Sequence, residues 1–342
     1  SRVMAADAVA ATDRSDLLDR SGRGISEKDL ALGRLARQPS EIPMRGWWSV
    51  LRRVWREAAS DNISMSAASC GFFALLAMFP ALSVLISLYG LAFDPASVER
   101  QLEVVREFLP PASYDLIAGR VHDLVATNNS KLGWRLGISV ALALWSASAA
   151  TKAMMTALNQ SYEEEEKRGF LRFNAVALVF TLGGILGMSL ALSIIVGVPA
   201  VLQLVWLGPL ADIALRLVSW ILLAGFLILG LAVLYRWGPS RRIARWRWIT
   251  PGSVFVAVVW IVASALFSFY VANFSSYDVT YGSLGAVVAA MMWLYISAFV
   301  VLIGAELNAE LELQTLRDTT AGPVRPMGER GAFVADNVAD DS

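Results

Sequence analysis

Six long stretches of the sequence carry no charged side chain, and they constrain the fold more than any other feature. A helix needs about 20 mainly apolar residues to cross the hydrocarbon core of a bilayer. Charged residues make up 17% of the chain, whereas ordinary soluble domains contain about 25%. The chain is therefore predicted to be an all-α, polytopic membrane helical bundle. The charge-free stretches are 62–93, 136–151, 173–211, 217–235, 248–277 and 279–305.

Two of these stretches need separate treatment before the spans are counted. The stretch 136–151 is short, but Arg135 and Lys152 at its ends can extend their charged groups to the interfaces. The stretch 173–211 is too long for one crossing, and Gly197-Val198-Pro199 and Gly208-Pro209 favour a turn at a membrane surface. We therefore expect six transmembrane helices, at about 66–92, 134–158, 174–199, 213–236, 249–273 and 282–308.

The positive charges fall mainly on one side of these predicted spans. The two terminal segments, together with the loops after the second and fourth spans, hold 22 Lys and Arg. The three loops on the opposite side hold six. Cytoplasmic segments of membrane proteins carry the excess of Lys and Arg, so both termini are predicted to be cytoplasmic. An even number of spans agrees with that orientation.

Outside the predicted spans the chain divides into two tails, one interfacial helix and one external segment. Residues 1–40 and 314–342 mix charged and small residues without apolar periodicity. We expect both to be disordered cytoplasmic tails that flank a membrane domain at 41–313. The external segment 94–131 predicts two short amphipathic helices separated by a Pro-Pro pair. These two helices would either cap the bundle or line an entrance to it.

Residues 45–60 predict a basic amphipathic helix that lies in the membrane interface. Trp47, Trp48 and Trp55 recur at helical spacing, and four arginines occupy much of the remaining surface. This combination of tryptophan and arginine is typical of interfacial helices. Simple anchoring is one interpretation, and a lipid-specific or partner-specific role is the other. Because the aromatic face favours lipid, we expect membrane lipids as the partner and no nucleic acid.

The sequence offers few residues for catalysis or metal binding. His122 is the only histidine and Cys70 the only cysteine. This argues against a multi-histidine metal site, a Ser-His-Asp triad and an intrachain disulfide. The usual metal, phosphate and nucleotide motifs do not occur. The acidic run 163–166 is followed by Lys167 and Arg168 and is interpreted as a solvated loop. We therefore expect no enzyme activity, no cofactor and no metal site.

Two features inside the spans are compatible with packing or with transport. Gly183 and Gly187 form a GxxxG pattern, which allows two helix backbones to approach closely. Pro80 falls in the middle of the first span and predicts a kink there. Packing seams and transport paths both use such residues.

The last span ends in an acidic stretch whose placement requires an explanation. From Ser283 to Glu306 a helix rises about 35 Å, whereas the hydrocarbon core is about 30 Å thick. Glu306, Asn308 and Glu310 therefore lie near the cytoplasmic boundary. Carboxylates are unfavourable at a helix C-terminus, so a compensating cation is expected. Lys152 is one candidate. The loop before the fifth span supplies Arg236, Arg241, Arg242, Arg245 and Arg247.

Three interpretations of this acidic stretch stay open. Glu306 and Glu310 can form a structural clamp with the basic loop or with the end of the second helix near Asn159. They can instead handle a proton or a substrate. They can also be plain solvated acids at the end of a helix.

Three stretches of the chain together carry a family resemblance. They are TYGSLGAVVAAMMWLYISAFVVLIGAELNAELE, YRWGPSRR followed by RWRWITPG, and ALNQSYEEEEKR. They resemble the YihY/BrkB-type inner-membrane family, formerly labelled ribonuclease BN-like, over about residues 47–313. The resemblance implies six spans with cytoplasmic ends in the bacterial inner membrane. The motif positions that carry over, with no catalytic role attached, are Glu306, Asn308, Glu310, Asn159, Tyr281 and Gly282.

The resemblance also implies a connection with envelope lipids. The leading hypothesis is a non-enzymatic inner-membrane protein that transports or handles lipid or another envelope component. In this mechanism the basic loop at 236–247 attracts anionic lipid headgroups to a polar furrow. The alternative is a structural or scaffold membrane protein without transport, and a membrane-bound ribonuclease or hydrolase is third. The sequence names no oligomeric partner.

Overall fold

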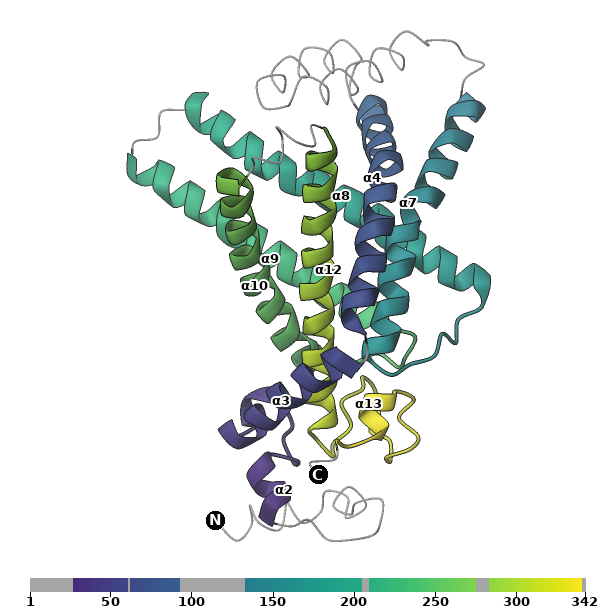
Figure 1. Ribbon diagram of the computed structural model, residues 1–342, viewed down its shortest axis with the longest axis vertical. Helices are drawn as coiled ribbons and strands as arrows, with labels where there is room; N and C mark the ends of the chain where they lie inside the picture. Colours follow the sequence, from purple (N-terminus) through teal and green to yellow (C-terminus); the bar gives the residue numbers. More distant parts are fainter. Residues whose placement is uncertain (1–26, 61, 93–132, 205–208, 275–282, 340–342) are drawn as a thin grey trace. The chain divides into compact units, whose positions relative to one another are not determined.

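The computed structural model describes residues 27–60, 62–92, 133–204, 209–274 and 283–339, and most of these residues are helical (Figure 1). No β-strand occurs among them, and Ala244 and Thr320 form only an isolated antiparallel bridge. The all-α prediction is confirmed. The helices are α2 (Glu27–Leu32), η2 (Pro39–Glu41), α3 (Met44–Ser60), α4 (Ile63–Ala92), α7 (Gly133–Ser161), α8 (Phe170–Leu204), α9 (Pro209–Trp237), α10 (Trp246–Phe274), α12 (Ser283–Leu313) and α13 (Phe333–Asp336).

Five of these helices, α4, α8, α9, α10 and α12, are long and apolar enough to cross a membrane. Many of their apolar side chains point outward, as Leu222, Val258 and Leu266 do. Lipid can cover such side chains, and a helix satisfies its own backbone within the hydrocarbon. α7 is 29 residues long, but its described residues do not combine length and apolar composition as those five helices do. Five spans are therefore supported directly, where six are expected.

One predicted boundary differs from the structure. The sequence analysis places the end of the third span at about residue 199, because Gly197 and Pro199 favour a turn. α8 instead continues through both residues to Leu204. Proline is tolerated within membrane helices when neighbouring groups satisfy the freed backbone carbonyl. Glycine and proline therefore did not mark the helix end here.

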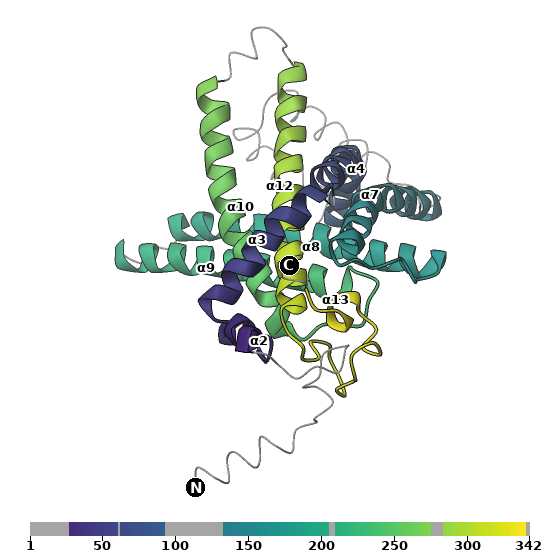
Figure 2. The same ribbon diagram turned by 60° about the horizontal axis from the view of Figure 1, so that its bottom comes forward.

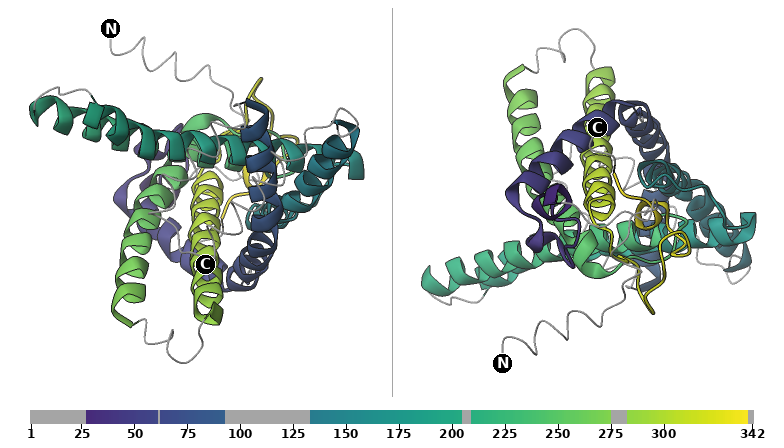
Figure 3. Two further views of the ribbon diagram at one scale, coloured as in Figure 1. Left: turned by 90° about the horizontal axis from the view of Figure 1, so that it is seen from above. Right: turned by 90° about the horizontal axis from the view of Figure 1, so that it is seen from below.

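The chain divides into two compact units. The first unit comprises the described parts of Ser1–Phe72, Ala153–Phe170 and Trp220–Ser342. In it α10 packs along α12, and the two helices stay side by side in each view (Figures 2 and 3). A Cβ atom at Gly252 would collide with the Gly304 carbonyl oxygen and with the Asn308 side chain. Glycine at this position therefore allows α10 and α12 to approach closely.

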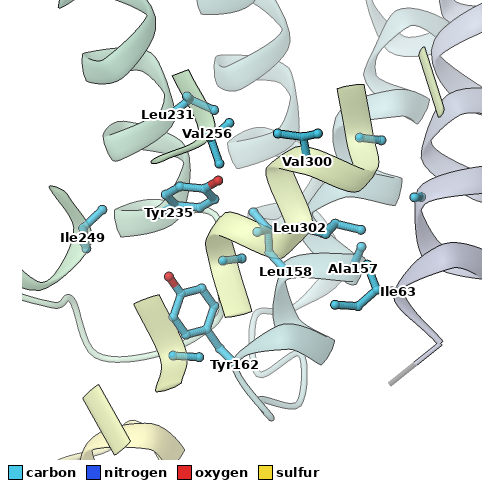
Figure 4. Close-up of a cluster of buried hydrophobic side chains, with 14 of the residues drawn as sticks. Ile63, Ala157, Leu158, Tyr162, Leu231, Tyr235, Ile249, Val256, Val300 and Leu302 are labelled. Carbon is cyan, nitrogen blue, oxygen red and sulfur yellow. The ribbon is translucent and has the colours of Figure 1, made fainter. Parts of the chain in front are cut away.

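An apolar cluster joins the segments of this first unit (Figure 4). It brings Ile63 of α4 and Leu158 of α7 together with residues of α9, α10 and α12. Tyr162 and Tyr235 lie within it and are completely buried. The polar groups described below are therefore built into the side of an apolar core.

The second unit comprises the described parts of Phe73–Lys152 and Leu171–Ser219. The hydroxyls of Thr151 on α7 and Thr181 on α8 lie 2.8 Å apart and share a hydrogen bond. A Cβ atom at Gly183 would meet no atom within 4 Å. The predicted close helix approach at Gly183 is therefore not seen, and polar threonines form a contact between α7 and α8.

Most of the predicted C-terminal tail is folded. Residues 314–339 pack on the end of α12, and Arg330 is 1% exposed. The Arg330 guanidinium donates to the Leu316 and Ala335 carbonyl oxygens at 2.9 and 2.8 Å, and Ala339 N donates to the Leu313 carbonyl at 3.0 Å. The expectation of disorder is wrong for these residues. Hydrogen bonds from the buried Arg330 to backbone carbonyls hold the segment in place without a large apolar core.

The end of the predicted N-terminal tail is folded as well. Residues 27–40 include α2 and the start of η2, and Arg34 is buried. Leu316 N donates to the Arg34 carbonyl at 2.8 Å, and Arg34 Nη2 donates to the Ala339 carbonyl at 2.7 Å. The two end segments are thus hydrogen-bonded to each other. The predictions for residues 1–26, for the external segment 94–131 and for Tyr281 and Gly282 lie outside the described residues.

Candidate functional site

The acidic end of α12 is buried on every side. Glu306, Asn308, Glu310 and Glu312 are between 0% and 4% exposed, and Gln314 just beyond the helix is 0% exposed. Successive even-numbered residues of a helix point in different directions. Several segments must therefore surround α12 to bury all of them, and each segment contributes its own polar partner.

α3 covers one side of α12 through a cluster that we name the α3 clamp, formed by Arg53, Glu310 and Gln314. Arg53 Nε donates to Glu310 Oε2 at 2.5 Å, and Arg53 Nη2 donates to Gln314 Oε1 at 2.6 Å. Arg53 Nη1 donates to Ser49 Oγ at 2.7 Å, which fixes the guanidinium against its own helix. The expected partner of Glu310 was the basic loop or the end of the second helix, and the structure places Arg53 there instead.

A second cluster, which we name the α12 hub, consists of Tyr162, Arg241, Glu306, Asn308 and Glu312. Arg241 Nη2 donates to Glu312 Oε1 at 2.5 Å, and both side chains are fully buried. Thr319 Oγ1 donates to Glu312 Oε2 at 2.6 Å. Burial alone would lower the pKa of Arg241, but the Glu312 carboxylate raises it above its usual value. The Arg241 guanidinium therefore keeps its charge in the buried pair.

Several hydrogen-bond donors of the hub lack a partner of ordinary geometry among the described residues. The Arg241 guanidinium lies 4.4 Å from the centre of the Tyr162 ring. Among the described residues, Arg241 Nε and Nη1, the Tyr162 hydroxyl and Asn308 Nδ2 have no hydrogen-bond partner of ordinary geometry. The other end of the Asn308 amide is engaged, because Gly252 N donates to Asn308 Oδ1 at 2.8 Å.

Burial and the neighbouring groups of the hub all affect the pKa of Tyr162. Burial raises the pKa of the Tyr162 phenol well above its usual value, and the charge of Arg241 opposes that rise. Glu312 and Glu306 raise the pKa further, and the Asn308 amide lowers it. The phenol is therefore neutral at physiological pH and keeps its proton as a donor.

A third cluster links the end of α7 to the loop after α9. Asn159 Nδ2 donates to Glu166 Oε2 at 3.0 Å, and Ser240 N donates to Asn159 Oδ1 at 2.7 Å. Arg168 binds both Glu166 oxygens at 2.7 Å and donates to the Gly238 carbonyl at 2.9 Å. Burial raises the pKa of Glu166, but the hydrogen bonds from Arg168 and Asn159 outweigh it and lower the pKa to about 2.

The acidic run 163–166 is therefore only partly solvated. Glu164 is 8% exposed. Its Oε1 accepts from Phe333 N at 2.7 Å, and its Oε2 binds Lys167 Nζ at 2.8 Å. The expectation of a solvated loop is wrong for Glu164, because its carboxylate is buried and holds a backbone donor and a lysine ammonium. Glu166 is exposed, as expected, although it binds Asn159 and Arg168.

The basic loop at 236–247 does not present a row of free arginines. Arg241 is in the hub, Arg242 Nη2 donates to the Pro323 carbonyl at 3.0 Å, and Arg245 Nε donates to the Thr320 carbonyl at 2.9 Å. Arg236 lies 4.4 Å from the Trp246 ring centre. Arg247 is the member of this set that is exposed. The loop thus binds the folded C-terminal segment and does not form an exposed cationic surface.

The remaining predicted positions fall in different places. Lys152 belongs to the second unit, where its ammonium lies 4.1 Å from the Trp145 ring centre. Trp48 and Trp55 are 74% and 84% exposed on α3, whereas Trp47 packs against the buried cluster of α3 and α12. The sequence analysis did not identify four residues as partners in this site. They are Tyr162 and Glu312 of the hub and Arg53 and Gln314 of the α3 clamp. The described residues contain no group of three or more His, Cys, Asp or Glu placed to hold a metal ion.

The chain is similar in sequence to one protein family and to several bacterial proteins. The family described as "Virulence factor BrkB" matches residues 54–327. A Bacillus subtilis protein named "Putative ribonuclease-like protein YfkH" is 30% identical over 77% of this chain and 95% of its own length. A UPF0761 membrane protein of Pseudoalteromonas translucida is 25% identical over 80% of this chain and 88% of its own length.

A further UPF0761 membrane protein, from Alteromonas mediterranea, is 30% identical over 75% of this chain and 85% of its own length. No solved structure matches the chain. The matched region includes the α12 hub, the third cluster and five helices able to cross a membrane. The chain is an integral membrane protein and belongs to the BrkB family.

Proposed function

We propose that this protein transports or handles a lipid or another envelope component that carries a phosphate or carboxylate group, and that the α12 hub is where this group binds. The observation that supports the proposal is the set of buried donors that the protein leaves unused. Arg241 Nε and Nη1, the Tyr162 hydroxyl and Asn308 Nδ2 belong to one cluster and lack partners of ordinary geometry among the described residues.

Such donors are unusual in a folded protein. More than about 90% of buried polar groups are hydrogen-bonded, and an unsatisfied one costs about 1–3 kcal/mol. Arginine and amide donors match the acceptor oxygens of phosphate and carboxylate groups. A substrate that supplies such oxygens would remove this cost, which favours a binding role for the hub.

The position of the hub suits an amphiphilic substrate. α12 contains 31 residues, so it rises about 46 Å. The hydrocarbon core is about 30 Å thick, so the ends of α12 reach the interfaces. The hub belongs to the last turns of α12, where a lipid headgroup would lie while its chains stay in the hydrocarbon.

A scaffold role is the second candidate, and a separate observation favours it. Glu310 is bound by Arg53, and Glu312 is bound by Arg241 and Thr319, which is the arrangement expected of a rigid structural clamp. A hydrolytic or ribonuclease activity has less support, because both of these carboxylates accept hydrogen bonds from protein donors. The name "ribonuclease-like" describes the Bacillus subtilis relative.

The proposed topology has six spans, with both termini in the cytoplasm of a bacterial inner membrane. The excess of Lys and Arg in the terminal and even-numbered loops supports it. In a Cys70→Ser background, Ser40→Cys and Val324→Cys give exposed single cysteines. An impermeant thiol reagent should label both only from the cytoplasmic face, and labelling from the other face would reverse the orientation.

The hub proposal is tested by removing one unused donor. Tyr162→Phe deletes a hydroxyl without an ordinary hydrogen-bond partner, so the free energy of unfolding should change by less than about 1 kcal/mol. A hydrogen bond to a charged group contributes about 1.5–3 kcal/mol. We therefore expect redistribution of labelled anionic lipid in proteoliposomes to fall about tenfold or more, with zwitterionic lipid measured beside it.

Tyr235→Phe is the matched control, because the Tyr235 hydroxyl donates to the Val301 carbonyl at 2.7 Å and serves packing. It should lower stability and leave redistribution per folded molecule unchanged. Redistribution that is unaffected by Tyr162→Phe would contradict the binding role of the hub. A folded native protein that moves no labelled lipid would favour the scaffold role.

A further inference from the structure

α3 presents an apolar row that the rest of the protein does not cover. Met44, Trp48, Leu51 and Trp55 are 84%, 74%, 46% and 84% exposed. Their spacing of four, three and four residues places them along one face of the helix. Two tryptophans and two aliphatic side chains in water would carry a large hydrophobic cost, so the row requires a partner surface.

A row of arginines flanks this apolar row. Arg45, Arg52 and Arg56 are exposed, and helical spacing places them side by side next to Trp48 and Trp55. Arg56 pairs with Glu57 at 3.2 Å across a largely solvated contact. The exposed surface of α3 is therefore apolar along its centre and positively charged along one edge.

The opposite face of α3 is used for packing. Val50, Val54 and Gly46 are buried, and Val50 and Val54 share a cluster with Leu307 and Leu311 of α12. The α3 clamp lies on this inner face, because Arg53 binds Glu310 and Gln314. The clamp thus fixes the rotation of α3 and directs the apolar row away from α12.

We propose that α3 lies on the cytoplasmic surface of the membrane, with Met44, Trp48, Leu51 and Trp55 inserted between lipids and Arg45, Arg52 and Arg56 bound to anionic headgroups. A lipid surface is the partner that satisfies both rows at once. Tryptophan and leucine enter the headgroup boundary, while arginines attract anionic lipid. A nucleic acid would engage the arginines and leave the apolar row in water. The inference does not depend on transport, because a scaffold could bind the surface in the same way.

Spin labels on the full-length protein in nanodiscs test the apolar row. In a Cys70→Ser background, Trp48→Cys and Trp55→Cys carry the label on the proposed inserted face, and Ser60→Cys carries it at an exposed polar position of the same helix. We expect labels at 48 and 55 to collide more with oxygen than with a water-soluble nickel chelate, and the label at 60 to show the reverse. Preferential collision with the nickel chelate at 48 and 55 would overturn the proposal and assign the face to another partner.

The arginine row is tested by lipid composition. Each arginine near an anionic surface changes the ratio of docked to undocked helix by about fivefold, so Arg45→Gln, Arg52→Gln and Arg56→Gln together should change it about 100-fold. The label at 55 should become more immersed when phosphatidylglycerol replaces part of the phosphatidylcholine, and the triple variant should lose this response. The same response in both proteins would refute the role of the arginines. Neither experiment measures transport. Failure of the transport proposal can therefore be distinguished from failure of the proposal that α3 binds the membrane surface.

Discussion

The two halves of α12 have the same helical backbone and opposite surroundings. In the first half, Val288 and Met292 are 63% and 54% exposed within the protein and are apolar. In the last turns, Glu306, Glu310 and Glu312 are at most 4% exposed. The apolar half can rely on lipid as its surroundings, whereas the polar half is enclosed by α3, α10, the loop after α9 and the C-terminal segment.

This difference teaches where the specificity of the first unit resides. Lipid tails cover any apolar helix equally well, so the exposed half of α12 carries little information about its neighbours. Buried charges tolerate only partners of the right sign and geometry. The α3 clamp and the α12 hub therefore select which segments assemble around α12. Substitutions in the polar half should lower the free energy of unfolding more than substitutions in the apolar half.

The largest expected effect comes from removing one charge of the hub. Arg241→Met leaves the Glu312 carboxylate buried, with the Thr319 hydroxyl still donating to it. Breaking a buried pair in this way costs about 3–5 kcal/mol. The free energy of unfolding in mixed micelles should fall by that amount. Val288→Ala, a change of similar simplicity in the exposed half, is the control. Equal losses for the two variants would erase the contrast between the halves.

A smaller loss is expected where α10 meets α12. Gly252→Ala places a methyl group against the Gly304 carbonyl and the Asn308 amide, so the helices must separate. Overpacking of this kind costs about 1–3 kcal/mol. Gly183→Ala is the matched control, because its methyl group would meet no atom within 4 Å. An equal response from both glycines would show that the close approach at Gly252 does not limit packing.

The smallest effect is a pH dependence carried by Glu166. Its folded pKa of about 2 lies below its ordinary value of 4.5, so its contribution to stability is present above pH 4.5 and is lost as pH falls toward 2. The carboxylate is partly solvated, which limits the contribution to about 1 kcal/mol or less. Glu166→Gln should flatten the melting temperature against pH in this window.

Asp318 also has a lowered pKa, because hydrogen bonds from Thr320 outweigh its burial. Both carboxylates therefore contribute to the change of melting temperature with pH in the native protein. Subtracting the melting temperatures of Glu166→Gln from those of the native protein isolates the contribution of Glu166. A difference that does not change between pH 5 and pH 2.5 would remove Glu166 from the account.

The sequence predicts the membrane half well and the polar half only in outline. A helix surrounded by lipid must lack charged side chains whichever helices lie next to it. Charge-free stretches therefore reveal the spans without any knowledge of how the helices pack. The need for a cation near Glu310 also follows from the helix dipole. Its identity does not, because Arg53 lies 257 residues away and is one of several arginines with similar local sequence.

The folded C-terminal segment was missed for a related reason. A polar composition without periodicity predicts disorder when burial depends on apolar side chains. Here Arg330 and Thr315 are buried through hydrogen bonds to backbone carbonyls, and such carbonyls exist in every sequence. Nothing in the composition of residues 314–339 distinguishes them from a solvated tail.

The most direct test of the account is a double-mutant cycle on the α3 clamp. Arg53→Met and Glu310→Leu, made singly and together, should give a coupling free energy of about 2 kcal/mol or more in unfolding measured in mixed micelles. The exposed pair Arg56 and Glu57 is the control, and its coupling should lie within experimental error. Additive effects at Arg53 and Glu310 would contradict the claim that buried charge pairing around the end of α12 holds the surrounding segments together.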